Sequence, residues 1–598
     1  MAFVIRVYAA RAGPESVPMN LPLASSPGKM RLLPVCSLLG LLLPPLAHAV
    51  PVDLGPLTGF YRHTQLQGHL VQNGLELYRV PDFWCAGSDF PYQKKAAARE
   101  VFFVDEFSVT RFLGGYNQNW AHQGNQLPAN DLAYRNAEGK ICYRLHLVRE
   151  RLAPYLENGY TRFIIGIENV PWALSRDPKK SGPYGATEPP RDWNEWRDFL
   201  RAVCGEMARV WPEEVTRHLA FKIGNEYNQK KSFTGSHEDY LKLYDHSAAA
   251  IREVFPAAAI MPGEIGGEAA GPDNAVDYPQ LFEHLARGKN LAGQTAPSPV
   301  AVLARSSHSF PHTRDLSPAE RVSASVESFR QVLAGKPEAF VRGLSLEYHQ
   351  FGVLGAPFTE MSFGPTDARA ASWHFQVMFR AKAAGMLDRC WSWSKADKVE
   401  FSKTAETHFL TGVGWLFSVF DHLRGDRTWL LDAEASGGPA ADVTAAGFVR
   451  AGRVVVLLAS WSRDPVATLP VTVRVALPRA LRPFPLVANR VRILSFTNET
   501  CVHGAIRRDL AAANNLHPDF AAHPEMLAPL RQMAGDYLAA RAMVAKNRRH
   551  YEQAQQACLT LQPVPADGLV LAGAPEAPEL QLTTTLAPNE VRVLVFAP

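Results

Sequence analysis

The sequence predicts an α/β fold, a (β/α)8 TIM barrel followed by a C-terminal β-sandwich domain with a helical insertion. Between about residues 74 and 423, short apolar segments alternate with longer amphipathic segments. After about residue 427, strand-like segments follow one another without intervening helices. The rival fold, a doubly wound open sheet, usually has a glycine-rich phosphate loop after its first strand, and the sequence has no such loop.

The N-terminal segment has the pattern of a leader. Lys29 and Arg31 lie at the start of an apolar run, Leu32–Leu46, which Pro44-Pro45 would break as a helix and which ends in Ala47-His48-Ala49. A basic start, a short apolar run and a small-x-small end are typical of a signal peptide, and the run is too short to span a bilayer. We therefore expect a leader and signal peptide over residues 1–49, with the signal peptide at about 30–49, and a secreted or periplasmic protein without a membrane span.

The apolar segments of the predicted barrel give eight candidate strands, and helical spacing lies between them. The strands are expected at Leu75–Val80, Ser108–Leu113, Thr161–Ile167, Leu219–Gly224, Ala259–Pro262, Val300–Ala304, Arg342–Leu346 and Leu387–Trp393. Helices are expected at Trp193–Val210, Glu238–Val254, Ala319–Leu333, Ala370–Ala384 and Leu410–Leu423. The barrel is predicted to occupy residues 50–425.

The predicted sandwich occupies residues 426–598. Its candidate strands are Val454–Ala459, Pro470–Ala476, Arg490–Phe496 and Val591–Phe596, and a helical insert is expected at about 505–560. Shielding the barrel is the favoured role of this domain, with glycan binding as the alternative.

Composition limits the partners and cofactors. The net charge is only +4 over 598 residues and no basic block occurs, so nucleic acid is not expected as a partner. Neither a CxxC nor an HExxH motif is present, so no metal or other cofactor is expected. Six of the seven cysteines follow the signal peptide, and six cysteines allow 15 disulfide pairings. Cys501 and Cys558, which bracket the helical insert, are the weakly favoured pair.

Two apolar strands are predicted to end in a glutamate. Glu226 follows the fourth candidate strand and Glu347 follows the seventh. A buried unpaired charge is costly, so a carboxylate at such a place is normally paired, solvated in a cleft or used in chemistry. Because the working residues of a barrel lie at the carboxyl ends of its strands, we expect both side chains at one mouth.

Two facing carboxyl groups are what glycoside cleavage requires. One is protonated and delivers a proton to the leaving oxygen, while the other is ionised and attacks the anomeric carbon. At a separation of ~5–5.5 Å the second group forms a covalent intermediate and configuration is retained. The sequence therefore predicts a glycosidase, with an oligosaccharide or polysaccharide as its substrate, and the resemblance described next implies a retaining one.

The motif Asn225-Glu226, together with Glu347, resembles clan A of the glycoside hydrolases, and within it family 39. Arg111 resembles the clan's arginine on strand two, and Trp393 resembles an aromatic platform on strand eight. The resemblance implies that Glu226 is the general acid/base and Glu347 the nucleophile. It also implies that Asn225 binds the 2-hydroxyl of the sugar and that Arg111 keeps the nucleophile ionised.

One position departs from the family pattern. His308 fits the family's strand-six motif, but Phe310 stands where a tyrosine is often found. Either His308 or Tyr348 takes over the contact of that tyrosine, or the strand is shifted. The full set of expected substrate-binding residues is Asn225, Arg111, His308, Trp393, Tyr348, Asn117, Trp120 and Glu264.

Two alternatives to this function stay open. The chain could be a carbohydrate-binding barrel without catalysis, or a glycosidase of another clan A family. An esterase of the α/β-hydrolase type is not favoured, because the sequence has no G-x-S-x-G motif.

Overall fold

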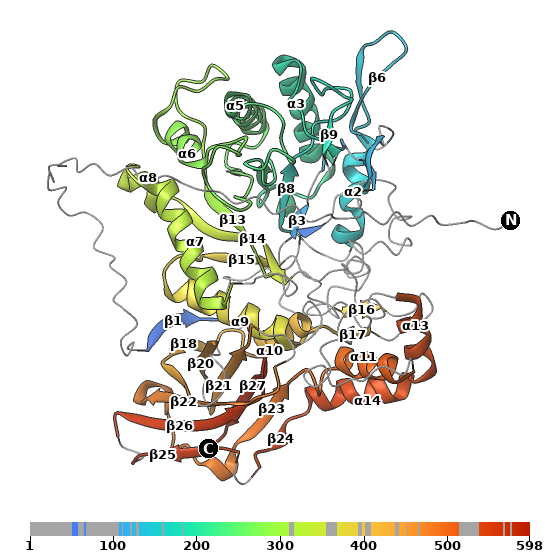
Figure 1. Cartoon of the computed structure of the whole chain (residues 1–598). Helices are drawn as coiled ribbons and strands as arrows, with labels where there is room; N and C mark the ends of the chain where they lie inside the picture. Colours follow the sequence, from blue (N-terminus) through green and yellow to red (C-terminus); the bar gives the residue numbers. More distant parts are fainter. Residues whose placement is uncertain are drawn as a thin grey trace, which may run out of the picture. The chain divides into compact units, whose positions relative to one another are not determined.

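The computed structural model describes the chain over residues 51–57, 65–66, 107–109, 112–115, 117–119, 122–126, 129, 131–157, 161–182, 185–309, 316–353, 368–392, 398–400, 408–436, 442–450, 452–463, 467–513, 537–565, 568–574 and 577–598. Figure 1 shows its helices and strands coloured along the sequence. Within these ranges, no helix combines the length and the apolar character needed to cross a membrane.

Eight parallel strands form the first part of the fold. Five make one sheet in the order β12-β11-β8-β3-β2, and three make a second sheet in the order β13-β14-β15. Their bounds are β2 Gln65–Leu66, β3 Phe107–Val109, β8 Phe163–Ile167, β11 Ala220–Ile223, β12 Ala259–Pro262, β13 Val302–Ser309, β14 Ser345–Val353 and β15 Arg389–Ser392. A parallel bridge between Ile265 and Arg305 connects the end of β12 to β13. The strands therefore follow one another in sequence order from β2 to β15.

Helices alternate with these strands. They are α2 His146–Glu157, α3 Trp193–Val210, α4 Glu213–Thr216, α5 His237–Val254, α6 Tyr278–Arg287, α7 Pro318–Leu333, α8 Glu338–Arg342, α9 Ala368–Ala383 and α10 Gly412–His422. Ser236 and Ser317 are the N-cap residues directly before α5 and α7, and each forms a capping box with an acidic residue three positions later. Such caps satisfy amide groups that the first helical turn leaves free, which explains why the helices begin there.

Several strand pairs lie in the connections. They are β4 Asn117–Asn119 with β5 His122–Gln126, β6 Ala133–Arg135 with β7 Ile141–Tyr143, β9 Ser181–Gly182 with β10 Gly185–Ala186, and β16 Lys398–Glu400 with β17 His408–Leu410.

Two antiparallel sheets form the C-terminal part. The first has the order β1-β18-β20-β21-β27-β23-β24 and the second β19-β22-β26-β25. Their bounds are β1 Val52–Pro56, β18 Arg427–Leu431, β19 Ala433–Ser436, β20 Asp442–Arg450, β21 Arg453–Trp461, β22 Val471–Pro478, β23 Arg492–Phe496, β24 Gln562–Pro563, β25 Val570–Ala572, β26 Glu579–Leu586 and β27 Val591–Phe596. Strand β22 buries every second residue, and its inner side chains share one apolar cluster with those of β21, β26 and β27.

Helices interrupt the antiparallel part where the insert was expected. They are α11 Val502–Ala513, α13 Tyr537–Lys546 and α14 Arg548–Leu559. Short 3-10 helices lie at Arg479–Leu481 and Ala488–Arg490.

The mixed α/β architecture with an antiparallel C-terminal part is confirmed. Helix α3 has the predicted bounds, and the candidate strand Leu75–Val80 lies outside the described residues. The predicted strand Arg342–Leu346 is displaced: Arg342 ends helix α8 and the strand is Ser345–Val353. Glu347 consequently lies inside β14 rather than after its end. Strand β1, which falls within the predicted barrel segment, pairs with β18 of the C-terminal sheet.

Candidate active site

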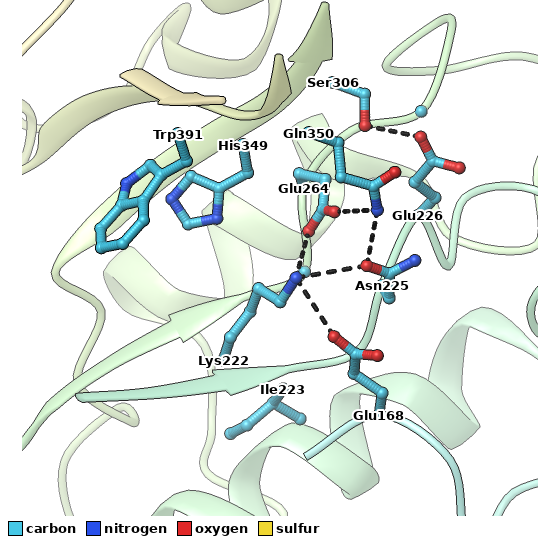
Figure 2. A network of polar contacts seen from close by, with 12 residues as sticks. Glu168, Lys222, Ile223, Asn225, Glu226, Glu264, Ser306, His349, Gln350 and Trp391 are labelled. Atoms are coloured by element: carbon cyan, nitrogen blue, oxygen red, sulfur yellow. Dashed lines mark hydrogen bonds and ion pairs between the residues drawn. The ribbon is translucent and has the colours of Figure 1, made fainter. Parts of the chain in front are cut away.

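Polar side chains gather at the carboxyl ends of the parallel strands, as Figure 2 shows. They come from β8, β11, β12, β13, β14 and β15 or from the residues that closely follow these strands. Figure 2 labels Glu168, Lys222, Asn225, Glu226, Glu264, Ser306, His349, Gln350 and Trp391. Glu347 belongs to the same group, because it binds His349 and Trp391. An apolar cluster of Ile164, Ala220, Met261, Val302 and Ala304 with the ring of Trp391 comes from the same strands. Because parallel strands bring their carboxyl ends together, residues distant in the sequence meet in one site.

Glu226 is buried with only 8% exposure, three residues after β11 ends. Ser306 donates a hydrogen bond of 2.5 Å to Oε1, and Gln229 donates one of 3.1 Å to Oε2. Burial raises the pKa of Glu226 and the negative charge of Glu264 raises it further, against the hydrogen bond from Ser306. A carboxyl group with a raised pKa is suited to carry a proton near neutral pH.

Glu347 is 1% exposed and its carboxylate has several donors around it. Ser345 donates to Oε1 at 2.8 Å, while His349 Nε2 and Trp391 Nε1 lie 2.9 and 2.7 Å from Oε2. Burial alone would raise the pKa of Glu347, but the hydrogen bond and charge of His349, with contributions from Arg389 and Trp391, lower it to about 2. This carboxylate is therefore ionised.

Lys222 lies at the centre of the network in Figure 2. Its ammonium nitrogen is 3.0 Å from Glu264, 3.2 Å from Glu168 and 3.2 Å from Asn225 Oδ1, and the side chains of all three charged residues have no exposed surface. Burial opposes its charge, but the two glutamates raise the pKa of Lys222. Removing one partner of such a buried ion pair typically costs about 3–5 kcal/mol of stability.

Gln350 connects strand β14 to this network. Its Nε2 lies 2.7 Å from Asn225 Oδ1 and 2.5 Å from Glu264 Oε1. The β13–β14 register shifts at this residue, and its φ of 46° lies in the left-handed region, which is unfavourable for a residue with a Cβ. The irregular backbone places the Gln350 side chain beside Asn225 and Glu264.

The two predicted catalytic glutamates are connected through neighbouring strands. Ser306, which binds Glu226, lies opposite His349 in the β13–β14 register, and His349 binds Glu347. The carboxylate with the largest electrostatic effect on Glu226 is nevertheless Glu264 rather than Glu347. The network therefore contains a third glutamate close enough to influence the acid.

The structure brings Asn225 and Glu264 together through Lys222, and Glu264 lies close enough to Glu226 to raise its pKa. His308 lies near the end of β13, and burial lowers its pKa to about 4, so it is neutral. Asn117 lies in β4. Arg111, Trp120, Phe310 and Trp393 lie outside the described residues.

Tyr348 is not brought to the site. It follows Glu347 on β14, and successive side chains of a strand point to opposite faces. Its ring stacks on Phe351, which in turn stacks on Trp373 of helix α9. The predicted substrate contact of Tyr348 is therefore corrected: the side chain is fully buried and stacked on Phe351.

Six residues of the network were not among the expected site residues, namely Glu168, Lys222, Ser306, His349, Gln350 and Trp391. Lys222 could have been identified from the sequence, because it lies within the apolar strand Ala-Phe-Lys-Ile and a buried lysine needs a charged or polar partner. The alternation of Ser345, Glu347 and His349 was a second signal, because it places three polar side chains on one face of a strand. Among the residues with described positions, no cluster of His, Cys, Asp or Glu is arranged to hold a metal ion.

The sequence model of the family described as "Glycosyl hydrolases family 39" matches residues 80–332. The chain is a relative of family 39. The resemblance indicated by the sequence motifs is thereby confirmed. The matched segment includes Asn225, Glu226, Glu264 and Ser306 and ends before Glu347.

Two curated relatives of the chain are glycosidases. The chain is 30% identical over 161 residues to an alpha-1,4-L-rhamnosidase of Formosa agariphila, which is 25% of this chain and 32% of that protein. It is 26% identical over 220 residues to a beta-xylosidase of Caldicellulosiruptor saccharolyticus, which is 35% of this chain and 40% of that protein. The matches thus span less than half of the length of each relative.

Solved structures of family 39 resemble the whole fold. A family 39 beta-xylosidase from Caulobacter crescentus has a TM-score of 0.52 at 14% identity, with 92% of this chain and 99% of that chain covered. The family 39 enzyme from Xanthomonas axonopodis pv. citri has a TM-score of 0.53 at 15% identity, with 92% and 98% covered. The likeness to these family 39 structures therefore extends from the parallel strands to the C-terminal part.

Proposed function

We propose that this family 39 relative is a retaining glycoside hydrolase in which Glu226 is the acid/base and Glu347 the nucleophile. The observation that carries the proposal is the opposite environment of the two carboxyl groups. Burial and Glu264 favour the protonated form of Glu226, whereas His349 and Trp391 favour the ionised form of Glu347. Two carboxyl groups whose pKa values are moved apart can serve as acid and nucleophile at one pH.

The reaction would proceed by two displacements. Glu226 donates its proton to the leaving glycosidic oxygen while the Glu347 carboxylate attacks the anomeric carbon, which gives a glycosyl ester. Glu226, now ionised, then accepts a proton from water as the water oxygen attacks the same carbon. The ester bond to Glu347 breaks, and the sugar leaves with its original anomeric configuration.

The same proposal includes closure of the parallel strands into a (β/α)8 barrel. Ile164, Ala220, Met261, Val302 and Trp391 belong to five different strands, and they share one apolar cluster. Side chains from several strands meet in this way in the interior of a barrel, where they form packed layers. The sequence order of the strands also agrees with a barrel.

The relatives indicate which substrates to assay first. Because a beta-xylosidase and an alpha-1,4-L-rhamnosidase are among them, 4-nitrophenyl β-D-xyloside and 4-nitrophenyl α-L-rhamnoside are the first compounds to assay. Asn225, directly before the acid/base, would bind the hydroxyl group next to the anomeric carbon. Loss of binding energy at that hydroxyl would lower kcat more than it changes KM, since the contact strengthens in the transition state.

Labelling with a 2-deoxy-2-fluoro glycoside and mutation of each carboxyl group test the assignment. Glu226→Gln and Glu347→Gln are each expected to lower kcat by about 1,000-fold or more, while the exposed Glu327→Gln leaves it unchanged. The 2-deoxy-2-fluoro glycoside should label Glu347, as peptide mass spectrometry would reveal. Label on Glu264 would transfer the nucleophile role there, and near-normal kcat in both variants would reject Glu226 and Glu347 as the catalytic pair.

Export is proposed on the leader pattern of residues 30–49. Expression in a bacterial host, followed by fractionation and N-terminal sequencing, tests it. A mature chain that begins near residue 50 supports export, and a full-length chain kept in the cytoplasm contradicts it.

A further inference from the structure

The amide groups of Asn225 and Gln350 have orientations that their charged neighbours dictate. The oxygen and nitrogen of an amide are similar in shape, so their placement follows from the partners. The Lys222 ammonium group only donates, and it lies 3.2 Å from an atom of Asn225, so that atom must be the oxygen Oδ1.

The same logic continues to Gln350. One atom of its amide reaches both Asn225 Oδ1, at 2.7 Å, and Glu264 Oε1, at 2.5 Å. Both of these oxygens accept, because Lys222 and His349 lower the pKa of Glu264 against its burial and keep it ionised. The atom must therefore be the nitrogen Nε2, whose two hydrogens satisfy the two oxygens.

Each amide is left with its other polar atom for a ligand. Asn225 presents the donor Nδ2 and Gln350 presents the acceptor Oε1. In Figure 2 both atoms point to the side on which Glu226 lies. Within the described part of the chain, neither atom has a hydrogen bond to another residue, and Asn225 is 8% exposed.

We propose that Lys222 sets the hydrogen-bond polarity of this site, meaning which atom of each amide group donates and which accepts. With this polarity, Asn225 Nδ2 and Gln350 Oε1 together bind one ring hydroxyl of a sugar. A hydroxyl group can accept from Nδ2 and donate to Oε1 at the same time, whereas fluorine or an ether oxygen cannot donate. Gln350 is thus a specificity-determining residue and Lys222 a positioning residue. This inference rests on the proposed function for its ligand, but not for the polarity of the network.

The backbone supports a dedicated role for Gln350. Its left-handed φ of 46° and the register shift at this point interrupt the alternation of β14. His349 and Gln350 both appear in the network as a result, although neighbours on a regular strand point to opposite faces. Strained conformations of this kind concentrate at functional sites.

Melting temperatures of a Gln350→Glu variant test the polarity without any substrate. A protonated carboxyl group can still donate, but an ionised one would place its charge against Glu264 and Asn225 Oδ1. We expect the melting temperature to fall further below that of the wild type at pH 8 than at pH 5. Gln331→Glu, at an exposed glutamine on α7, should show no such difference. Equal melting temperatures of Gln350→Glu and wild type at pH 8 would overturn the polarity.

Kinetics of Gln350→Met test the ligand, with Gln331→Met as the matched control. The substrates are 4-nitrophenyl β-D-xyloside and its analogues in which one ring hydroxyl at a time is replaced by hydrogen or fluorine. At one ring position, replacing the hydroxyl should lower kcat/KM about 100-fold or more relative to the parent substrate, both in the wild type and in Gln331→Met. The reason is that the analogue leaves the two amide atoms unpaired. In Gln350→Met, the ratio of kcat/KM for the parent substrate to that for the analogue should fall most of the way towards one. A ratio equal to that of the wild type would overturn the proposed contact.

The outcome for the wild type separates this inference from the proposed function. If the wild type cleaves neither the aryl xyloside nor the aryl rhamnoside, the hydrolase proposal fails. The rise in melting temperature with added D-xylose or L-rhamnose, in wild type and in Gln350→Met, then replaces kinetics. No rise with either sugar would overturn the hydroxyl contact, while the pH 5 and pH 8 comparison still decides the polarity.

Discussion

Glu226 and Glu347 are both buried glutamates, yet their surroundings move their pKa values in opposite directions. Burial acts on both in the same sense, so the difference comes from the neighbours. Glu226 faces the charge of Glu264, whereas Glu347 receives hydrogen bonds from Ser345, His349 and Trp391. Single substitutions of these neighbours should therefore change the pH dependence of activity in predictable directions.

Ser306→Ala should move the alkaline limb of the kcat/KM profile to higher pH. The hydrogen bond from Ser306 lowers the pKa of Glu226, so its loss lets the pKa rise and keeps the acid protonated to higher pH. At the optimum we expect about a tenfold loss of kcat/KM, the order of one hydrogen bond to a reacting group. Ser307→Ala, at the neighbouring buried serine, is the control. A limb that moves to lower pH would contradict this account.

His349→Phe should move the acidic limb to higher pH. His349 lowers the pKa of Glu347, and without it the carboxylate takes up a proton at higher pH. The wild-type pKa of about 2, below the ordinary 4.5, stabilises the folded state above about pH 4.5, and this stabilisation is lost as the pH falls towards 2. The melting temperature of the variant should accordingly change less between pH 7 and pH 3.

Two comparison variants make the His349 test specific. His349→Gln keeps a donor near Glu347, so its acidic limb should lie between those of His349→Phe and the wild type. If His349 acted through packing alone, the donor would make no difference to the position of this limb. The exposed His218→Phe should behave as the wild type. If the acidic limb of His349→Phe lies at the same pH as that of the wild type, His349 does not hold the carboxylate ionised.

At the scale of elements, apolar patterning predicted the helices and many strands but misplaced the strand that carries Glu347. The run before Glu347 looked like a strand, although Arg342 ends the short helix α8. The actual strand, β14, alternates polar residues on its inner face, which apolar counting treats as a loop. Glu226 and Asn225 were predictable because they directly follow an apolar strand.

The contacts between neighbouring strands could not be predicted in the same way. Ser306 and Gln350 acquire their roles from the β13–β14 register and from a local irregularity in it. Neither feature leaves a hydrophobic pattern in the sequence, since each depends on which strands are neighbours. Tyr348 was misassigned for the related reason that one step along a strand reverses the face.

The connection after β12 offers a test of how closely the elements approach. A Cβ atom on Gly266 would lie 2.1 Å from Gln229 Nε2 and 2.7 Å from Glu226 Cδ. Gly266→Ala should therefore displace Glu226 and lower kcat by about 100-fold, with a small change in melting temperature. Gly271→Ala, in the same connection, meets only ordinary van der Waals contact and should be active. Full activity of Gly266→Ala would show that Glu226 tolerates the shift.

At the scale of the whole molecule, helix α9 connects the parallel strands to the C-terminal sheet. Arg369 is buried, donates to the carbonyl oxygen of Ser462, and its guanidinium lies 4.4 Å from the ring centroid of Trp461. Further along the helix, Arg380 donates to Thr444 and to the carbonyl oxygen of Val443. Phe351 of β14 stacks on Trp373 of the same helix. One helix thus contacts both parts of the fold.

These contacts predict that the two parts unfold together. We expect one cooperative transition in scanning calorimetry of the chain from residue 50 onwards. Arg369→Met should lower the free energy of unfolding by about 2–4 kcal/mol, because it leaves buried carbonyl groups without their donor. The control Arg217→Met removes only an exposed pair with Glu213 and should have little effect. The contrary outcome is two transitions, with Arg369→Met shifting only the one that belongs to the C-terminal part. In that case the sheet is an independent module, and removing residues 426–598 would leave the active site intact.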